Sequence, residues 1–299
     1  MKTLVIILCE TRAHELTFNN FKTNVIDELN ADLCLCIGVK QDYDYNNPFY
    51  TLAKYKFVYD EPDDFTSAFE YATNILSKDK SKFKELQEPL HWREFLKIKN
   101  QFLGGIKDAH NQHPGSGGIL LFFRWYLLHN FVENDIISKY DRFVVTRSDF
   151  IYQLPHPKME NLDPNSIWIP NCEHYGGFTD RHVVLSKSNC ESYLNILNNM
   201  VYKSNEYFSK MTSFKQWNPE KVIKFHLEQN NVLHLVREFP YIMYSVRNTN
   251  GPTSWSIGKF NDKLGYYIKY NSEYEKSNSY KLEFEKSGLA IDDFYHLKI

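Results

Sequence analysis

The sequence predicts an α/β protein with a central, mostly parallel sheet flanked by helices. Short β-branched runs alternate along the chain with longer segments whose apolar residues recur at helical spacing. A first strand over 4–9 precedes a helix over about 14–29 and a second strand over 31–39. A strand–helix–strand unit of this size is typical of two parallel strands joined by a right-handed crossover.

A third strand is predicted over 54–59, where the acidic segment 60–64 closes it and starts a helix through Ala72. The first 75 residues therefore look like a nucleotide-binding α/β half. They contain neither a G-x-G-x-x-G nor a G-x-x-x-x-G-K-[ST] motif. That absence counts against a dinucleotide-dependent oxidoreductase and a P-loop kinase.

The next part of the chain is predicted to be helical. Residues 77–90 are polar, and we expect a mobile surface connection there. Helices are predicted over 91–109 and 119–132, separated by a glycine-rich break at 113–118. We interpret the break as a turn, with a phosphate cradle as the alternative, because no strand precedes it. The second helix is apolar almost all round, so we expect it to be buried and Arg124 to need a partner.

Residues 140–186 concentrate the polar groups of the sequence. Strands are predicted over 142–146 and 167–170, and the turn at Gly176-Gly177 leads to another apolar stretch. The polar side chains at the ends of these runs are Arg147, Ser148 and Asp149, then Asn171, Glu173 and His174, and finally Asp180, Arg181 and His182. In open α/β sheets, ligands bind outside the carboxyl ends of the strands. We therefore predict a functional site at this edge of the sheet.

The rest of the chain is predicted to close the main domain. A helix is expected over 189–211, and another begins at Pro219 and continues through Gln229. Strands are expected over 232–236 and 240–246. We predict a main domain over 1–247 and a C-terminal extension over 248–299 that packs on it, because this last part is polar, rich in Tyr and Lys, and weakly patterned.

Composition excludes some classes of partner. A net charge of −2 provides no broad basic surface for nucleic acid. Aromatic residues make up 16% of the chain, which suits sugar rings but also follows from an AT-rich genome. The cysteine count is odd, so we expect reduced thiols. The apolar run 3–9 is too short for a membrane span and lacks a signal-peptide pattern, so we expect a cytoplasmic protein with no transmembrane segment.

Four stretches resemble glycosyltransferases of the GT-A type, in particular the compact kind found in bacteria and large DNA viruses. They are ILCETRAHE, YDRFVVTRSDF, WIPNCEHYGGFTDRHVVLSK and WNPEKVIKFHLEQNNV, and together they span roughly the first 240 residues. The order and spacing of the stretches carry the resemblance. It implies a GT-A-like nucleotide-binding fold that transfers a sugar from a nucleotide-sugar donor, with UDP as the default base, to a hydroxyl of a glycan or glycoconjugate. If the protein is viral, it would act in the host cytoplasm.

In GT-A enzymes an Asp-x-Asp motif after a central strand holds a divalent metal on the donor diphosphate. The matching position here reads Arg147-Ser148-Asp149, so Asp149 matches the last carboxylate and Arg147 replaces the first. We predict Mn²⁺ or Mg²⁺ at Asp149, bound together with the diphosphate oxygens. Alternatively, Arg147 itself neutralises the phosphates, because a guanidinium forks onto phosphate oxygens. A third interpretation is a structural salt bridge between the two residues.

The resemblance also leads to roles for other residues. Asp180 is our candidate for the general base that an inverting transfer needs, with Glu173 second. Thr11 and Arg12, at the end of the first strand, are candidates for binding the nucleotide. His182 is a candidate diphosphate contact or metal ligand. Turn chemistry explains an Asp at 180 equally well, and a structural role explains His182.

Two other classes of function stay open. A nucleotidyltransferase or phosphate-ester hydrolase would use Asp149 and Asp180 on a metal and turn over a nucleotide without a sugar acceptor. A non-catalytic glycan- or protein-binding module would keep the fold without the chemistry. Glu220 is explained by the dipole of the helix that it starts. The sequence leaves the donor sugar, the stereochemical outcome and the oligomeric state open.

Overall fold

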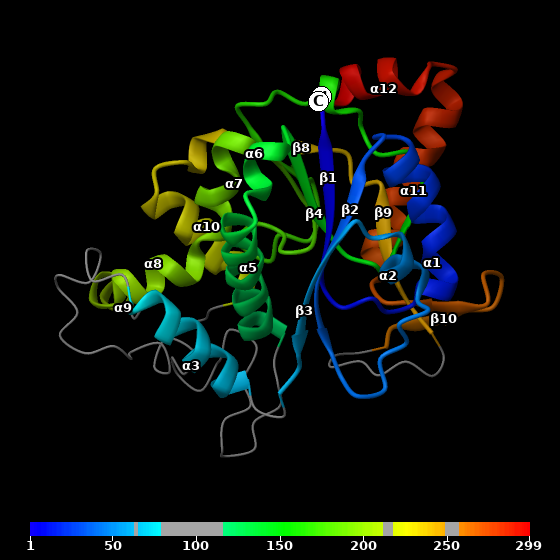
Figure 1. Cartoon of the computed structure of the whole chain (residues 1–299). Helices are drawn as coiled ribbons and strands as arrows, with labels where there is room; N and C mark the ends of the chain where they lie inside the picture. Colours follow the sequence, from blue (N-terminus) through cyan, green and yellow to red (C-terminus); the bar gives the residue numbers. More distant parts are fainter. Residues whose placement is uncertain (63–64, 79–115, 212–217, 249–256) are drawn as a thin grey trace.

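The computed structural model describes residues 1–62, 65–78, 116–211, 218–248 and 257–299 (Figure 1). The polar connection predicted at 77–90, the helix at 91–109 and most of the glycine-rich break lie outside these residues.

The main sheet has seven strands in the order β3-β2-β1-β4-β7-β6-β8. Their bounds are β1 (Thr3–Cys9), β2 (Asp32–Val39), β3 (Tyr55–Asp60), β4 (Arg142–Thr146), β6 (Ile167–Pro170), β7 (Val183–Ser186) and β8 (Val236–Phe239). The pairs β3–β2, β2–β1, β1–β4 and β6–β8 are parallel, whereas β7 is antiparallel to both of its neighbours. The predicted α/β fold with a mostly parallel central sheet is therefore confirmed.

Both faces of this sheet are covered, which the near-continuous apolar runs of the strands require. In β1, Leu4 and Ile6 belong to one hydrophobic cluster, and Val5 and Ile7 belong to the other. The first cluster includes residues of α3 (Phe65–Leu76), α5 (Ser116–Glu133), α6 (Ile136–Lys139), α7 (Lys187–Leu194), α8 (Ile196–Tyr202), α9 (Ser204–Met211) and α10 (Pro219–Gln229). The second includes residues of α1 (His14–Phe21), the π-helical turn Lys22–Asp27, α2 (Pro48–Leu52), α11 (Asn271–Ser287) and α12 (Ile291–Lys298). Figure 1 shows these two helical layers on either side of the sheet.

Helix α5 is buried almost all round, as predicted from its sequence. Its Arg124 is 1% exposed and finds the partner that burial requires. The guanidinium donates to the Asp180 carbonyl oxygen at 3.1 Å and lies 5.5 Å from the centre of the Tyr193 ring. Arg124 thereby ties the buried helix to the loop that precedes β7.

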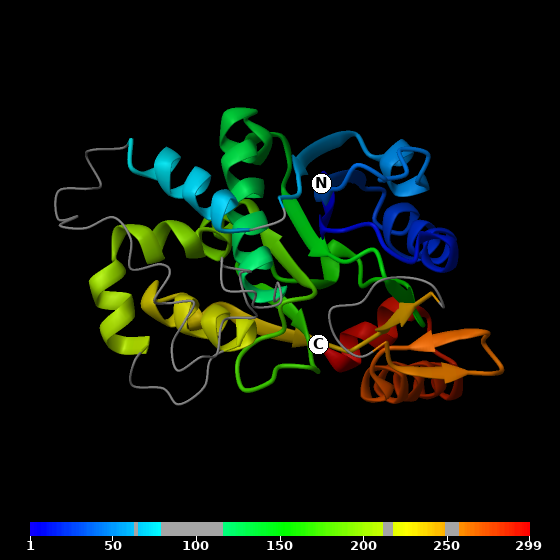
Figure 2. The ribbon, with the colours of Figure 1, turned by 90° about the horizontal axis from the view of Figure 1, so that it is seen from below.

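A second, smaller sheet lies beside the main one, in the order β10-β11-β9-β5. Its strands are β5 (Phe150–Tyr152), β9 (Met243–Arg247), β10 (Lys259–Asn261) and β11 (Tyr266–Ile268), all paired antiparallel. Figure 2 shows β10, β11 and α11 together, on the side of the molecule away from α8 and α9. Because β5 starts only three residues after β4 ends, residues 147–149 lie at the junction of the two sheets.

Three predicted elements differ from the structure. The strand expected over 232–236 is wrong, because residues 233–235 form a 3-10 turn and β8 begins at Val236. The helix expected over 189–211 is three helices, with breaks at Asn195 and Lys203. The weakly patterned C-terminal part contains two helices. The division at 247/248 stays a prediction, and strand pairing between β9 and β11 crosses it.

Two further predictions concern the thiols and the membrane. All five cysteines are free, and Cys34, Cys36 and Cys190 are buried. Within the part of the chain that the structure describes, no helix combines the length and the apolar character needed to cross a membrane.

Candidate functional site

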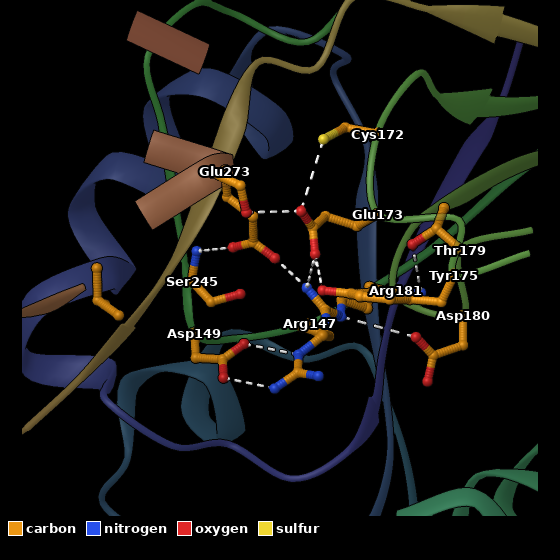
Figure 3. Close-up of polar contacts among 12 residues, drawn as sticks. Arg147, Asp149, Cys172, Glu173, Tyr175, Thr179, Asp180, Arg181, Ser245 and Glu273 are labelled. Atoms are coloured by element: carbon orange, nitrogen blue, oxygen red, sulfur yellow. Dashed lines mark hydrogen bonds and ion pairs between the residues drawn. The ribbon is translucent and has the colours of Figure 1, made fainter. Parts of the chain in front are cut away.

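Polar side chains converge at one edge of the main sheet. The parallel strands β1 and β4 end there, and the antiparallel β7 begins there, so residues that precede β7 join residues that follow β4. Figure 3 shows the result, with Asp180 and Arg181 beside Arg147 and Asp149. The predicted convergence of these clusters is present, and the reversed strand is its structural cause.

Asp149 is enclosed by two arginines. It is 1% exposed. Arg147 donates from Nε to Oδ1 at 2.8 Å and from Nη2 to Oδ2 at 2.7 Å, and Arg247 at the end of β9 also donates to Oδ2. Burial alone would raise the pKa of Asp149, but the two guanidinium groups outweigh it and hold the pKa well below its usual range. This geometry matches the salt-bridge interpretation and extends it by a second arginine.

The loop after β1 is fixed to the same junction through Ser148. The Ser148 hydroxyl donates to the carbonyl oxygens of Glu10 at 3.0 Å and Arg12 at 3.2 Å. The Arg12 side chain forms an ion pair with Glu10, and its charge is among those that lower the pKa of Asp149. Arg12, one of the two predicted nucleotide contacts, therefore lies near the central motif.

Thr11, the other predicted nucleotide contact, borders a group of tyrosines. Its hydroxyl is 2.8 Å from the Tyr43 hydroxyl and accepts from Asn47 Nδ2 at 3.0 Å. The rings of Tyr43 and Tyr45 lie 5.1 Å apart, those of Tyr45 and Tyr50 lie 5.2 Å apart, and Tyr45 is 52% exposed. The end of β1 thus offers a polar anchor beside an accessible aromatic surface.

A second buried ion pair joins the loop before β7 to the C-terminal part of the chain. Arg181 pairs with Glu273 of α11, whose exposed fraction is 0%. Glu273 also accepts the Ser245 backbone N–H at 2.6 Å, and the Arg181 guanidinium lies 4.4 Å from the centre of the Tyr270 ring. Sequence reasoning missed Glu273, because nothing in the polar pattern of its segment marks one carboxylate as buried.

Glu173, the second candidate for the base, already has several partners. It has a positive φ of 61° and accepts hydrogen bonds from Ser272 Oγ at 2.8 Å and from the Tyr175 hydroxyl. Its carboxylate also lies 3.9 Å from Arg181 Nη1. These contacts leave Glu173 less free than Asp180 to accept a proton from a substrate.

Asp180 has a different environment. Its carboxylate is 9% exposed, and its one hydrogen bond or ion pair with a described residue is a 3.7 Å contact to Arg181 Nε. Glu220 in the first turn of α10 lies close by. Burial, followed by the charge of Asp180, raises the pKa of Glu220 to about 7. The two carboxylates therefore compete for ionisation, as interacting acids do.

Close packing between the loop before β7 and α10 brings these carboxylates together. Phe178 donates its backbone N–H to the Glu220 carbonyl oxygen at 3.0 Å. A Cβ at Gly177 would meet that same oxygen at 1.9 Å, so only glycine fits there. The helix dipole explained Glu220 in the sequence, whereas its tertiary neighbour Asp180 had no sequence signal.

His182 lies in a buried histidine pair. It is 1% exposed, with Nδ1 3.0 Å from Thr146 Oγ1 and Nε2 3.2 Å from His156 Nε2. Burial, then the His156 ring, lowers the pKa of His182 well below its usual value. Both nitrogens have partners, so this geometry favours the structural role. A donor contact of His182 stays a prediction.

The metal predicted at Asp149 finds a poor fit in this arrangement. Both carboxylate oxygens face arginine nitrogens, whereas Mn²⁺ and Mg²⁺ need free oxygen ligands. Among the residues that the structure describes, no group of three or more His, Cys, Asp or Glu side chains could hold a metal ion. The metal stays a prediction, and no step proposed below uses it.

Comparisons with known proteins add one similarity. No protein-family model matches the chain, and no curated protein sequence matches it. Among solved structures, the apo form of mouse xyloside xylosyltransferase 1 is similar, with a TM-score of 0.35 and 9% sequence identity over 79% of this chain and 84% of that chain. At this identity and TM-score, the similarity assigns neither a donor nor an acceptor to this chain.

Proposed function

We propose that the protein is a glycosyltransferase that moves a sugar from a nucleotide-sugar donor, with a UDP-sugar as the first candidate, to a hydroxyl of a glycan or glycoconjugate. One observation carries the proposal. Asp180, a carboxylate with few partners, lies at the same sheet edge as Arg147, and its charge raises the pKa of Arg147. A base and an anion-binding group thus lie side by side, and the resemblance of the sequence to GT-A transferases supports the same chemistry.

The reaction would proceed as follows. The acceptor oxygen attacks the anomeric carbon of the donor, and the bond from that carbon to the diphosphate oxygen breaks. Asp180 takes the proton of the acceptor hydroxyl, which corresponds to an inverting transfer. The negative charge that develops on the leaving diphosphate is stabilised by Arg147. Glu173 is the second candidate for the base.

The nucleoside is proposed to bind at the ends of β1 and β2. Thr11 and Arg12 supply polar groups there, and the accessible Tyr45 ring supplies a surface on which a base can stack.

The test is a transfer assay with the full chain. The purified protein is incubated with UDP- and GDP-sugars and a set of oligosaccharide acceptors, and products are detected by mass spectrometry. We expect one donor to yield an acceptor heavier by one sugar, together with the free nucleoside diphosphate. Nucleotide turnover without any glycosylated product would contradict the proposal and favour the hydrolase or nucleotidyltransferase.

The alternatives have less support from the geometry. The nucleotidyltransferase and hydrolase would need Asp149 on a metal, and both of its oxygens face arginines. A non-catalytic glycan-binding module would retain glycan binding and show no donor turnover. In that case Asp180→Asn would leave glycan binding unchanged.

A further inference from the structure

Lys269 is a cation with an unusual position. It lies between β11 and α11 and is partly buried, and its backbone N–H donates to the Ser245 carbonyl oxygen at 2.9 Å, which fixes it beside β9. Its ammonium nitrogen is 5.0 Å from the centre of the Tyr270 ring. Lys269 takes part in none of the ion pairs between described residues.

The charges that surround Lys269 are mainly positive. Burial, then Arg147, Arg247 and Arg181, lowers the pKa of Lys269 to about 7, and Asp149 is the one carboxylate among the principal charges that act on it. Holding a lysine among three arginines is unfavourable unless an anion compensates for it.

Arg247 supplies a second, independent observation. It is 2% exposed, and its Nη1 donates to Asp149 and to the Val246 carbonyl oxygen at 2.7 Å. Its Nε and Nη2 are buried and have no hydrogen-bond partner among the described residues. Buried donors without acceptors are rare and costly, so each calls for a missing partner.

One missing partner would satisfy both residues. Asp149 is a single carboxylate shared by Arg147 and Arg247, so the group formed by Arg147, Arg247 and Lys269 has more positive charge than Asp149 can balance. Arg181 has its own carboxylate in Glu273. A group with several oxygens and at least two negative charges fits such a cluster, and a diphosphate has both properties.

We propose that Arg147, Arg247 and Lys269 bind the diphosphate of the donor directly, so that protein cations neutralise it without a divalent metal. Lys269 and Arg247 are then donor-binding residues from the second sheet. Because this inference rests on the proposed function, its test uses a probe that contains phosphates alone.

The experiment is calorimetric titration of the full chain with inorganic pyrophosphate and with UDP, in the presence of EDTA. Four proteins are compared: the natural chain, Lys269→Met, Lys269→Arg and Lys263→Met. Lys263 is the matched control, because it is exposed in the turn of the same hairpin. We expect metal-free binding of pyrophosphate, a loss of about tenfold or more in Lys269→Met, recovery to within a few-fold in Lys269→Arg, and no change in Lys263→Met.

Three results would overturn the proposal. Binding that needs Mn²⁺ would assign the phosphates to a metal, and equal binding by the natural chain and Lys269→Met would remove Lys269 from the site. A lower unfolding temperature of Lys269→Met would make the lysine structural, whereas removal of a cation crowded by arginines is expected to leave the protein at least as stable.

The same measurements separate this proposal from the transferase itself. Metal-free pyrophosphate binding that depends on Lys269, without sugar transfer from any donor, would overturn the transferase and support the anion site. Sugar transfer that is unaffected by Lys269→Met would support the transferase and overturn the anion site.

Discussion

Two aspartates at the same edge of the sheet have opposite environments. Asp149 has both oxygens held by arginines, which hold its pKa well below the usual range. Asp180 has one long contact to Arg181 and a second carboxylate nearby, and the pKa of that neighbour, Glu220, is raised to about 7. Pairs of acids whose surroundings shift their pKa values apart usually divide structural and catalytic work between them. The residue that matches the family motif is the structural one in this comparison.

The largest expected effect is on stability, at Asp149. Asp149→Asn removes the charge that balances two buried guanidinium groups, so we expect the free energy of unfolding to fall by about 3–5 kcal/mol. Urea unfolding followed by circular dichroism measures it. Asp262→Asn, an exposed change in the β10–β11 hairpin, is the control and should have almost no effect. A loss at Asp149 as small as that of the control would mean that the arginines do not depend on this carboxylate.

The next effect is on catalysis, at Asp180. Asp180→Asn keeps the shape and removes the base, so we expect kcat of sugar transfer to fall about 100-fold or more. The free energy of unfolding should stay within about 1 kcal/mol of the natural chain, because a single 3.7 Å contact to Arg181 is lost. Transfer assays and urea unfolding on the same samples separate the two effects. Full activity of Asp180→Asn would move the role of base to Glu173.

The smallest effect is a pH-dependent one at Glu220. Its pKa in the folded protein is raised, so the protonated form is favoured and stability is lost as pH rises from about 4.5 to about 7. Glu220→Gln imitates the protonated form. At pH 8 we therefore expect this variant to be about 1–3 kcal/mol more stable than the natural chain, with the difference vanishing below about pH 4.5.

Thermal unfolding at pH 5 and pH 8 checks this prediction. Glu228→Gln is the control, since Glu228 lies exposed on the same helix. A difference between Glu220→Gln and the natural chain that does not change with pH would contradict the coupling between Glu220 and Asp180.

Much of the fold could be predicted because local pattern determines it. The strands with β-branched runs, such as β1 and β4, were predicted within a residue or two. Helix α11 was missed because its inward side carries Glu273 and Ser277 as fully buried residues, which removes the apolar periodicity on which helix prediction depends. The turn at 233–235 was read as a strand because its apolar residues have no helical repeat.

The site was predictable only in part, for a related reason. Strand ends indicated where Asp149 and Asp180 would lie. The partners that decide their roles come from distant positions: Arg247 is 98 residues from Asp149 along the chain, and Glu220 is placed beside Asp180 by a close approach that needs Gly177. Such pairings depend on tertiary contacts, and a single sequence contains no local signal for them.

The burial of Glu273 against Arg181 has a consequence for how the protein is made. As the chain leaves the ribosome, Arg181 emerges some 90 residues before the carboxylate that neutralises it. Until Glu273 has been synthesised and α11 has docked on β9, the loop before β7 has an uncompensated cation at its centre. The final arrangement of Asp180 is thus reached late in biosynthesis, so a nascent chain is expected to acquire its full set of site contacts only after its last helices have formed.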